Sequence, residues 1–293
     1  MKMNLMIGVA LALLSAAASG ISVVSVRRHS DGSSVFNMSF VITAVGLMVL
    51  LPLALAEGSF GLITPAGFAF FAVSGLLSPG LVRLFYYKGL KTLGASVNSS
   101  VFAIYPLYSS LLAVVLLSEI ITVWNALGIV SIISGVILIE RYMNGKSEKG
   151  RIGWKSMIIP FLGGLMLGVA TIFRKFALDA SNAPVLGVAV AYVFSLLPYI
   201  LLIATSEPTR KDLSLKKDFR LFWAAGLGQA VSWLLAFYAL SVEQVSIITP
   251  LIAVEPLFVV GFGYFYLREK EHVSAPLAAS IAIAVIGIAL IAL

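Results

Sequence analysis

The chain has 293 residues, of which 60% are hydrophobic and 11% are charged, and its mean hydropathy is +1.04. A soluble domain carries roughly 25% charged residues, so this composition excludes an ordinary soluble protein and indicates an integral membrane protein. With no cysteine and only two histidines, both near segment edges, we expect no thiol chemistry and no histidine-based metal or catalytic centre. The net charge of +7 is attributed to cytoplasmic loops rather than to nucleic-acid binding.

Ten apolar segments follow one another along the chain, each close to the roughly 20 residues that a spanning helix needs. They lack the alternating pattern of membrane β-barrel strands, and open strands cannot cross a bilayer. We therefore predict an all-α membrane protein with ten transmembrane helices. The segments are residues 5–26, 35–56, 66–87, 96–117, 123–139, 156–176, 185–205, 219–240, 247–267 and 273–292.

Two stretches, residues 78–119 and 228–269, resemble each other when the chain is shifted by 150 residues. An internal repeat of this length determines the architecture, because each copy is expected to form the same group of helices. The matches that carry most weight are those outside the abundant leucines and alanines. They are Ser96 with Ser246, Pro106 with Pro256 and Glu119 with Glu269.

The repeat divides the ten segments into two groups of five, residues 1–141 and 156–293. A polar and basic linker, residues 142–155, joins them. Because five is an odd number, two equivalent groups in one chain must cross the membrane in opposite senses. We therefore predict two inverted five-helix repeats (5+5), an arrangement common in secondary transporters.

The basic residues are divided unevenly between the two ends of the predicted bundle. Loops after the odd-numbered segments carry 16 of the 20 lysines and arginines, whereas the opposite side carries only Lys2, Arg174 and Lys175. The remaining one, Arg83, is the only basic residue expected deep inside an apolar segment. Basic loops stay in the cytoplasm, so we predict a multi-pass protein of the plasma membrane with both termini outside the cytoplasm.

Four motifs in two matched pairs resemble those of a known family. They are YKGLKTLGAS at residues 87–96 and FYALSVEQVS at 237–246, then IYPLYSSLLAVVLLSE at 104–119 and VEPLFVVGFGYFYLRE at 254–269. With the ten segments, they resemble the drug/metabolite transporter (DMT) superfamily, specifically its EamA-domain branch. The resemblance covers nearly the whole chain and implies a transporter of small metabolites, amino acids, nucleotide sugars or drugs, usually outward. Such relatives often have cytoplasmic termini, the reverse of what these loop charges predict.

Polar side chains inside spanning helices are costly and tend to face the interior of the bundle. In the third and eighth segments, Arg83 and Trp233 occupy equivalent positions on stripes of polar and aromatic residues. The fourth and ninth segments carry matching stripes, so we expect these four segments to enclose a central cavity. The predicted substrate-binding residues are Arg83, Tyr87, Asn98, Tyr105, Gln229, Trp233 and Glu255.

Several of these residues also have structural interpretations, which the sequence leaves open. Arg83 either binds a carboxylate or phosphate of the substrate, pairs with Glu255, or extends toward the cytoplasmic interface. Glu255 either couples transport to proton entry, because a carboxyl group in a low-dielectric cavity can hold a proton, or has a structural role. Tyr105 and Trp233 fit core packing as well as ligand contact.

The sequence as a whole predicts a secondary active transporter, an exporter or exchanger of small metabolites such as amino acids or other small organic anions. It would work by alternating access around the cavity, with Pro106 and Pro256 as hinges or as static kinks. No nucleotide-binding motif or catalytic cluster is visible, so ATP-driven transport and an enzyme are not expected. A channel-like facilitator is the main alternative. The expected partners are the lipid bilayer, the small-molecule substrate and a proton as coupling ion, with no cofactor or metal, in a monomer or homodimer.

Overall fold

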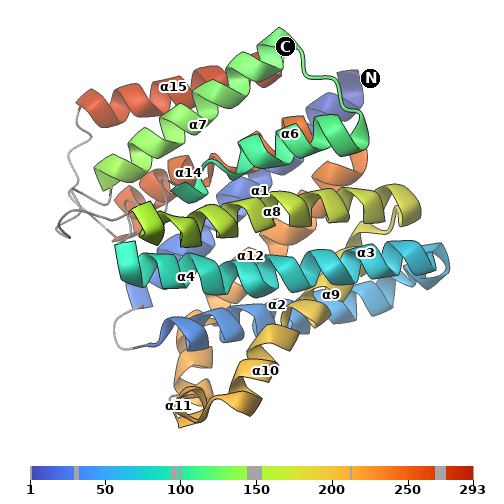
Figure 1. Ribbon diagram of the computed structural model, residues 1–293, viewed down its shortest axis with the longest axis vertical. Coiled ribbons are helices and arrows are strands. Elements are labelled where there is room, and N and C mark those ends of the chain that lie inside the picture. Colours follow the sequence, from blue (N-terminus) through green and yellow to red (C-terminus); the bar gives the residue numbers. More distant parts are fainter. Residues whose placement is uncertain are drawn as a thin grey trace.

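The structure is a computed structural model that describes residues 2–29, 33–93, 98, 101–143, 154–211, 213–267 and 275–292. All regular structure in these residues is helical (Figure 1). Among them, seven helical stretches are long and apolar enough to cross a membrane, and three shorter apolar helices accompany these. The prediction of an all-α membrane protein is confirmed for this part of the chain, whereas the count of ten crossing helices stays a prediction.

The described helices of the first half follow the predicted segments closely. The short 3-10 turn η1 lies between α2 and α3, and the π-helical turn η2 separates α3 from α4. The fourth segment is described at residue 98 and from residue 101 onward. The bounds are α1 Lys2–His29, α2 Val35–Glu57, η1 Ser59–Leu62, α3 Pro65–Gly75, η2 Leu76–Leu81, α4 Val82–Leu93, α6 Tyr105–Leu117 and α7 Val123–Met143.

The second half departs from the predicted segments in two respects. Helix α8 continues to Ser181, beyond the predicted end at Phe176, and the ninth segment is divided into several helical pieces. The predicted linker 142–155 lies mostly outside the described residues, and its boundaries stay predictions. The bounds are α8 Trp154–Ser181, α9 Pro184–Ser195, α10 Leu197–Thr205, α11 Glu207–Lys211, α12 Leu215–Val242, α13 Val245–Ile252, α14 Glu255–Phe262, η3 Gly263–Leu267 and α15 Ala275–Ile291.

The tight connection between α2 and α3 illustrates how local sequence sets the helix ends. Gly58 adopts a left-handed conformation (φ 71°) and stops α2, which glycine does at little steric cost. The Thr64 hydroxyl then accepts a hydrogen bond from the backbone N–H of Gly67 at 3.0 Å, and Pro65 occupies the first helical position. Two consecutive antiparallel helices follow from these few residues.

The two halves are interleaved rather than packed side by side. Helix α1 packs along α12 of the other half, and α8 packs in the same way against α3 and α4. In the same way, the contact of α2 with α12 has its counterpart in that of α9 with α3. The contact of α1 with α14 has its counterpart in that of α8 with α6. Each contact therefore recurs with the halves exchanged, as an approximate two-fold relation between them requires.

The last helices of the two halves, α7 and α15, pack against each other as an antiparallel pair along one edge of the molecule (Figure 1). Glycines make this close approach possible. A Cβ atom on Gly128 would lie 2.8 Å from the carbonyl oxygen of Gly287, and a Cβ atom on Gly287 would lie 2.8 Å from that of Gly128. Close packing through small residues is the usual way in which helices associate in lipid.

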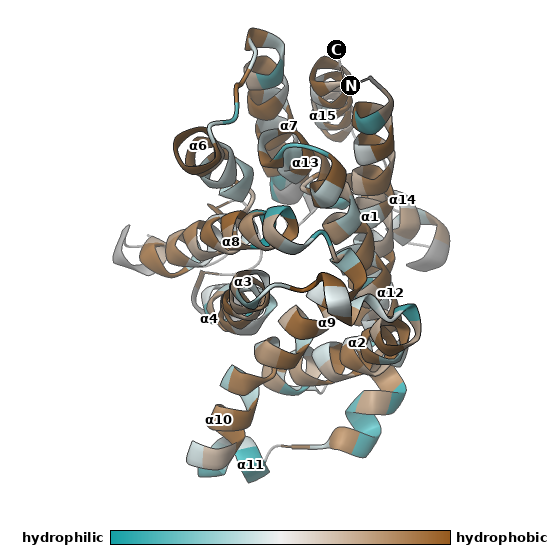
Figure 2. Cartoon of the chain, turned by 90° about the vertical axis from the view of Figure 1, so that its right-hand side faces the viewer, coloured by the Kyte–Doolittle hydropathy of each residue, from teal (hydrophilic) through white to brown (hydrophobic). Residues whose placement is uncertain are grey.

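Apolar side chains cover the outward faces of the helices, whereas hydrophilic residues gather near helix ends such as α11 (Figure 2). At one end of the molecule, on the right in Figure 1, residues at helix starts of the first half contact residues at helix ends of the second half. There the backbone N–H of Thr64 donates to the Ser181 hydroxyl (3.1 Å), and the Asn125 amide donates to the Ile291 carbonyl (3.5 Å). We call it the acidic end, because Glu57, Glu119, Asp179 and Glu243 lie at or next to the helix ends that meet there.

Candidate functional site

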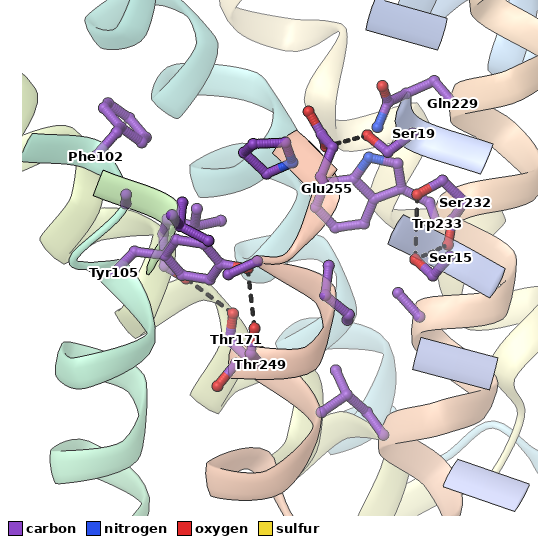
Figure 3. A pocket seen from close by; sticks show the side chains of 18 of the residues that line it. Ser15, Ser19, Phe102, Tyr105, Thr171, Gln229, Ser232, Trp233, Thr249 and Glu255 are labelled. Atoms are coloured by element: carbon purple, nitrogen blue, oxygen red, sulfur yellow. Dashed lines mark hydrogen bonds between the residues drawn. The ribbon is translucent and has the colours of Figure 1, made fainter. Parts of the chain in front are cut away.

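A cavity of about 240 Å³ lies in the middle of the molecule, between helices of both halves (Figure 3). It involves all four segments predicted to enclose it, through Tyr86, Tyr105, Trp233 and Glu255 among others. Helices α1 and α8 also line it, which was not expected. Its volume is below the roughly 300–1,000 Å³ of sites that hold drug-sized ligands, so the space suits a small solute.

Helix α1 contributes hydroxyl groups to one wall of the cavity. The Ser15 hydroxyl donates to the backbone carbonyl of Ser232 on α12 at 2.8 Å and lies 3.1 Å from the Ser232 hydroxyl. One turn further along, Ser19 donates a hydrogen bond to a carboxylate oxygen of Glu255 on α14. The serines stand one helical turn apart, so the same face of α1 serves both contacts.

Glu255 stands where the ninth segment is interrupted. Residues 253 and 254 form a turn between α13 and α14, and Glu255 is the first residue of α14, followed by Pro256. A carboxylate is favourable at a helix N-terminus, because the free backbone N–H groups carry a partial positive charge. In Figure 3, its side chain points toward Ser19, with Gln229 beside them.

Tyr105 occupies the equivalent place in the first half. Residues 103 and 104 form a turn, and Tyr105 begins α6 with Pro106 behind it. Its hydroxyl donates to the backbone carbonyl of Thr249 at 3.3 Å. Both prolines predicted as hinges thus follow a helix interruption at the cavity, although their motion stays a prediction. Broken helices at mid-membrane are a recurrent way to present polar groups to a solute.

The most unusual side chain of the cavity is that of Arg174 on α8, which is only 4% exposed. The centre of its guanidinium group lies 4.4 Å from the ring centre of Trp233 and 4.9 Å from that of Phe237. Its Nε and Nη2 atoms are buried and have no hydrogen-bond partner among the described residues. Two aromatic rings therefore lie close to this cation, whereas its Nε and Nη2 donors make no hydrogen bond within the described part of the chain.

The sequence interpretation was wrong about Arg174. The apolar segments predict that Arg174 lies at the loop end of a helix ending at Phe176 and that Arg83 is the only deeply placed basic residue. Because α8 continues to Ser181, Arg174 lies inside the helix instead. A usable signal existed: Leu167, Thr171 and Arg174 are spaced as one helical face and all line the cavity.

The other predicted binding residues lie elsewhere or cannot be placed. Arg83 donates to the Thr43 hydroxyl at 2.5 Å and interacts with the buried Tyr192, and it is not among the residues that line this cavity. Asn98 is fully buried and donates to the backbone carbonyl of Tyr86 at 3.0 Å. The side chain of Tyr87 lies outside the described part of the structure. Binding roles for these three residues stay predictions.

Between the cavity and the acidic end, α6 and α13 are joined by a polar seam. The Glu119 carboxylate accepts hydrogen bonds from the backbone N–H groups of Val245 (2.7 Å) and Ser246 (2.9 Å) and from the Ser246 hydroxyl (2.6 Å). Nearer the cavity, the hydroxyls of Ser109 and Thr249 lie 2.9 Å apart. Glu119 thereby caps α13 across the boundary between the halves.

The arrangement offers charge and hydrogen-bonding groups but no metal ligands. Among the described residues, no three His, Asp or Glu side chains lie together as a metal ion would need. What the cavity can do chemically is to bind a small solute through Arg174, Glu255 and several hydroxyl groups, against the aromatic surface of Trp233.

Comparison with known proteins agrees with this architecture. The model of the EamA-like transporter family matches the chain twice, at residues 6–141 and 154–293. A solved structure described only as the crystal structure of a protein superposes with a TM-score of 0.72 at 17% sequence identity, and the match covers 98% of this chain and 97% of the other. At that identity, the likeness concerns the fold alone. None of the curated proteins matches the chain.

Proposed function

This chain belongs to the EamA-like transporter family. We propose that it is a secondary active transporter of small organic metabolites, such as amino acids or other small organic anions, and that it works by alternating access. The observation that carries the proposal is the cavity of about 240 Å³ between helices of both halves, lined by a cation, a carboxylate and hydroxyl groups. A site at the boundary of two repeats can be exposed to either side when the repeats rock against each other.

Support for an inverted 5+5 arrangement comes from which helix ends meet. The residue before α3 contacts the last residue of α8, so the end of α2 lies beside the end of α8. If successive segments cross alternately, the end of α2 is on the same side as the start of α1. Helix α8, the equivalent of α1 in the second half, must then run in the opposite direction. The recurrence of the largest helix contacts between the halves, with the halves exchanged, agrees with this topology.

The orientation we propose follows from charge. With Arg174 inside the bundle, Lys2 and Lys175 are the basic residues left at the acidic end in the described part of the chain, and the basic loops predicted from the sequence belong to the opposite end. The positive-inside rule places the acidic end outside the cytoplasm. A reporter active only outside the cytoplasm should therefore work when fused after Leu293 and fail when inserted near Ser147. The opposite pattern would reverse the proposed orientation.

The proposed function is tested by transport in proteoliposomes. Vesicles containing the purified protein are loaded with one unlabelled amino acid or small organic anion, and uptake of the labelled solute is followed. A transporter gives saturable uptake with transient counterflow, and vesicles without protein provide the baseline. Flux that does not saturate and shows no counterflow would instead establish a channel-like facilitator. Absence of protein-dependent flux for every solute of the panel would contradict the proposed substrate class.

A further inference from the structure

The second half contains a unit that has no counterpart among the described residues of the first half. In the first half, α2 runs unbroken to Glu57, and Gly58 and the short turn η1 lead directly to α3. The equivalent stretch of the second half is divided into α9 and α10 and adds the short helix α11. Both α10 and α11 lie at the lower edge of the molecule, beside the start of α12 (Figures 1 and 2). The two-fold relation between the halves does not account for this unit.

The unit carries an excess of positive charge on its surface. Residues 206–223 include five basic and three acidic side chains. Two of the acidic side chains are described, and both are engaged. Glu207 pairs with Lys211, and the buried carboxylate of Asp218 accepts a hydrogen bond from the Ser33 hydroxyl at 2.7 Å. We call the exposed basic residues the basic cluster: Arg210, Lys211, Lys216, Lys217 and Arg220.

The charges of α12 show where this helix enters the membrane. All its charged residues lie in its first two turns, and residues 221–242 carry none. That uncharged stretch is long enough by itself to cross the roughly 30 Å hydrocarbon core. The first two turns of α12 therefore extend beyond the core into the layer of lipid headgroups, and α11 precedes them there.

The start of α12 has two different faces. One face packs against α2, where Phe222 is fully buried among apolar side chains. The other face carries an apolar stripe with four-residue spacing, which places its members above one another on the helix. Lys216 and Arg220 each follow a member of this stripe in the sequence and so lie next to it. The stripe consists of Leu215, Phe219 and Trp223, which are 46%, 44% and 50% exposed.

We infer that the basic cluster and the adjacent apolar stripe bind anionic phospholipids, such as phosphatidylglycerol. Lysine and arginine close to a membrane surface attract anionic headgroups, and tryptophan is favoured at headgroup level. The neighbouring helix α10 exposes Leu197, Ile200 and Leu201, which offer the acyl chains an apolar surface. This lipid site goes beyond the proposed transport function and depends neither on it nor on the proposed orientation.

The first test follows thermal unfolding of the purified full chain in a nonionic detergent. Phosphatidylglycerol, or phosphatidylcholine with the same acyl chains, is added in increasing amounts, and a lipid that binds the folded state raises the unfolding temperature. Phosphatidylglycerol should act at the lower concentration. The triple variant Lys216→Gln, Lys217→Gln, Arg220→Gln should require about 100-fold more of it, because each basic residue near an anionic surface contributes roughly fivefold.

The matched control removes three exposed basic side chains elsewhere, in the variant Arg28→Gln, Lys88→Gln, Arg141→Gln. It should change the effective concentration of phosphatidylglycerol less than about fivefold. Equal losses in the two triple variants, or equal stabilisation by the two lipids, would overturn the inference. Inorganic phosphate that stabilises the chain as well as phosphatidylglycerol does would mean a site for a free anion. Polyglutamate that stabilises it better would assign the basic cluster to an acidic protein partner.

The second test does not depend on protein stability. Brominated acyl chains quench tryptophan fluorescence on contact, and Trp223 lies in the stripe. In liposomes that contain equal amounts of both lipids, brominated phosphatidylglycerol should quench more strongly than brominated phosphatidylcholine. This difference should disappear in Trp223→Phe, while the three other tryptophans provide the common background. Equal quenching of the unmodified chain by the two lipids would overturn the inference, even if the triple variant of the basic cluster does not fold.

Discussion

Glu119 and Arg174 are both charged and buried, with exposed fractions of 9% and 4%, yet their surroundings differ completely. The Glu119 carboxylate receives three hydrogen bonds, all from the first turn of α13. The Arg174 guanidinium lies close to two aromatic rings and has two donor atoms without partners among the described residues. A buried charge that the protein satisfies supports the fold, whereas one that it leaves unsatisfied lowers stability and indicates a functional role.

The two regions also lie at different depths. Glu119 closes the seam between α6 and α13 near the acidic end, where it links the two halves of the chain. Arg174 lies at the cavity, where a solute would bind. Substitutions at the first site should therefore reduce stability, and substitutions at the second should reduce function while sparing stability.

The largest effect on stability is expected for Glu119→Ala. The change leaves two backbone N–H groups and one hydroxyl of α13 without an acceptor, and each such buried donor costs about 1–3 kcal/mol. Unfolding in detergent should therefore become easier by about 3 kcal/mol or more. Glu207→Ala on α11 is the control, because its exposed salt bridge with Lys211 contributes less than about 1 kcal/mol. Similar losses in the two variants would mean that the Glu119 cap contributes no more than an exposed salt bridge.

Arg174→Met should have the reverse profile. It removes an unsatisfied buried cation and retains much of the apolar contact with Trp233 and Phe237. Thermal unfolding should occur at the same or a higher temperature, while transport in proteoliposomes falls to the level of vesicles without protein. A clearly lower unfolding temperature would place Arg174 with Glu119 among the structural charges.

Glu255→Gln sharpens the comparison within the cavity itself. If a proton and the solute compete for this carboxylate, inward proton movement can be exchanged for outward solute movement. The amide cannot take up a proton, so an imposed pH gradient should no longer drive accumulation, although downhill flux continues at a higher KM. Glu243→Gln at the acidic end is the control. Retention of full gradient-driven transport by Glu255→Gln would make Glu255 structural.

The smallest expected effect is that of Tyr105→Phe. The change removes one hydrogen bond, from the Tyr105 hydroxyl to the Thr249 carbonyl at 3.3 Å. A neutral hydrogen bond contributes about 0.5–1.5 kcal/mol, so thermal unfolding should shift measurably but far less than with Glu119→Ala. Tyr142→Phe, at an exposed position on α7, serves as the control. A shift as large as that of Glu119→Ala would mean that the seam depends on Tyr105 more than on the cap.

The positions of the helices could be predicted from the sequence because lipid imposes one requirement on all of them, a long apolar stretch. The interruptions before Tyr105 and Glu255 were also signalled, since each is followed by a proline. The repeat match between Glu119 and Glu269 pointed to an important position, but not to its role. That role depends on α13, which approaches Glu119 only in the folded chain.

Arg174 was missed for a reason that lies in helix geometry. Neighbouring residues on a helix point about 100° apart, so Arg174 and Lys175 need not share an environment. Lys175 reaches the backbone carbonyls of Leu240 and Glu243 at the end of α12 (2.9 and 3.4 Å), whereas Arg174 faces the cavity. Only the packing of α8 against the other half shows which of two adjacent cations is buried.

The exchange of helices between the halves has a consequence for how the protein is made. Among the described residues, three buried hydroxyls of α1 donate to partners in the second half: Ser15 to the Ser232 carbonyl, Ser19 to Glu255 and Ser22 to the Ala225 carbonyl. During synthesis, α1 enters the bilayer long before α12 exists. Until α12 is inserted, these hydroxyl groups lie in lipid, which cannot satisfy their hydrogen bonds. A chain that ends in the linker is therefore expected to insert but to remain sensitive to protease. Co-expression of the missing half should restore resistance, because the two pieces complete each other's helices.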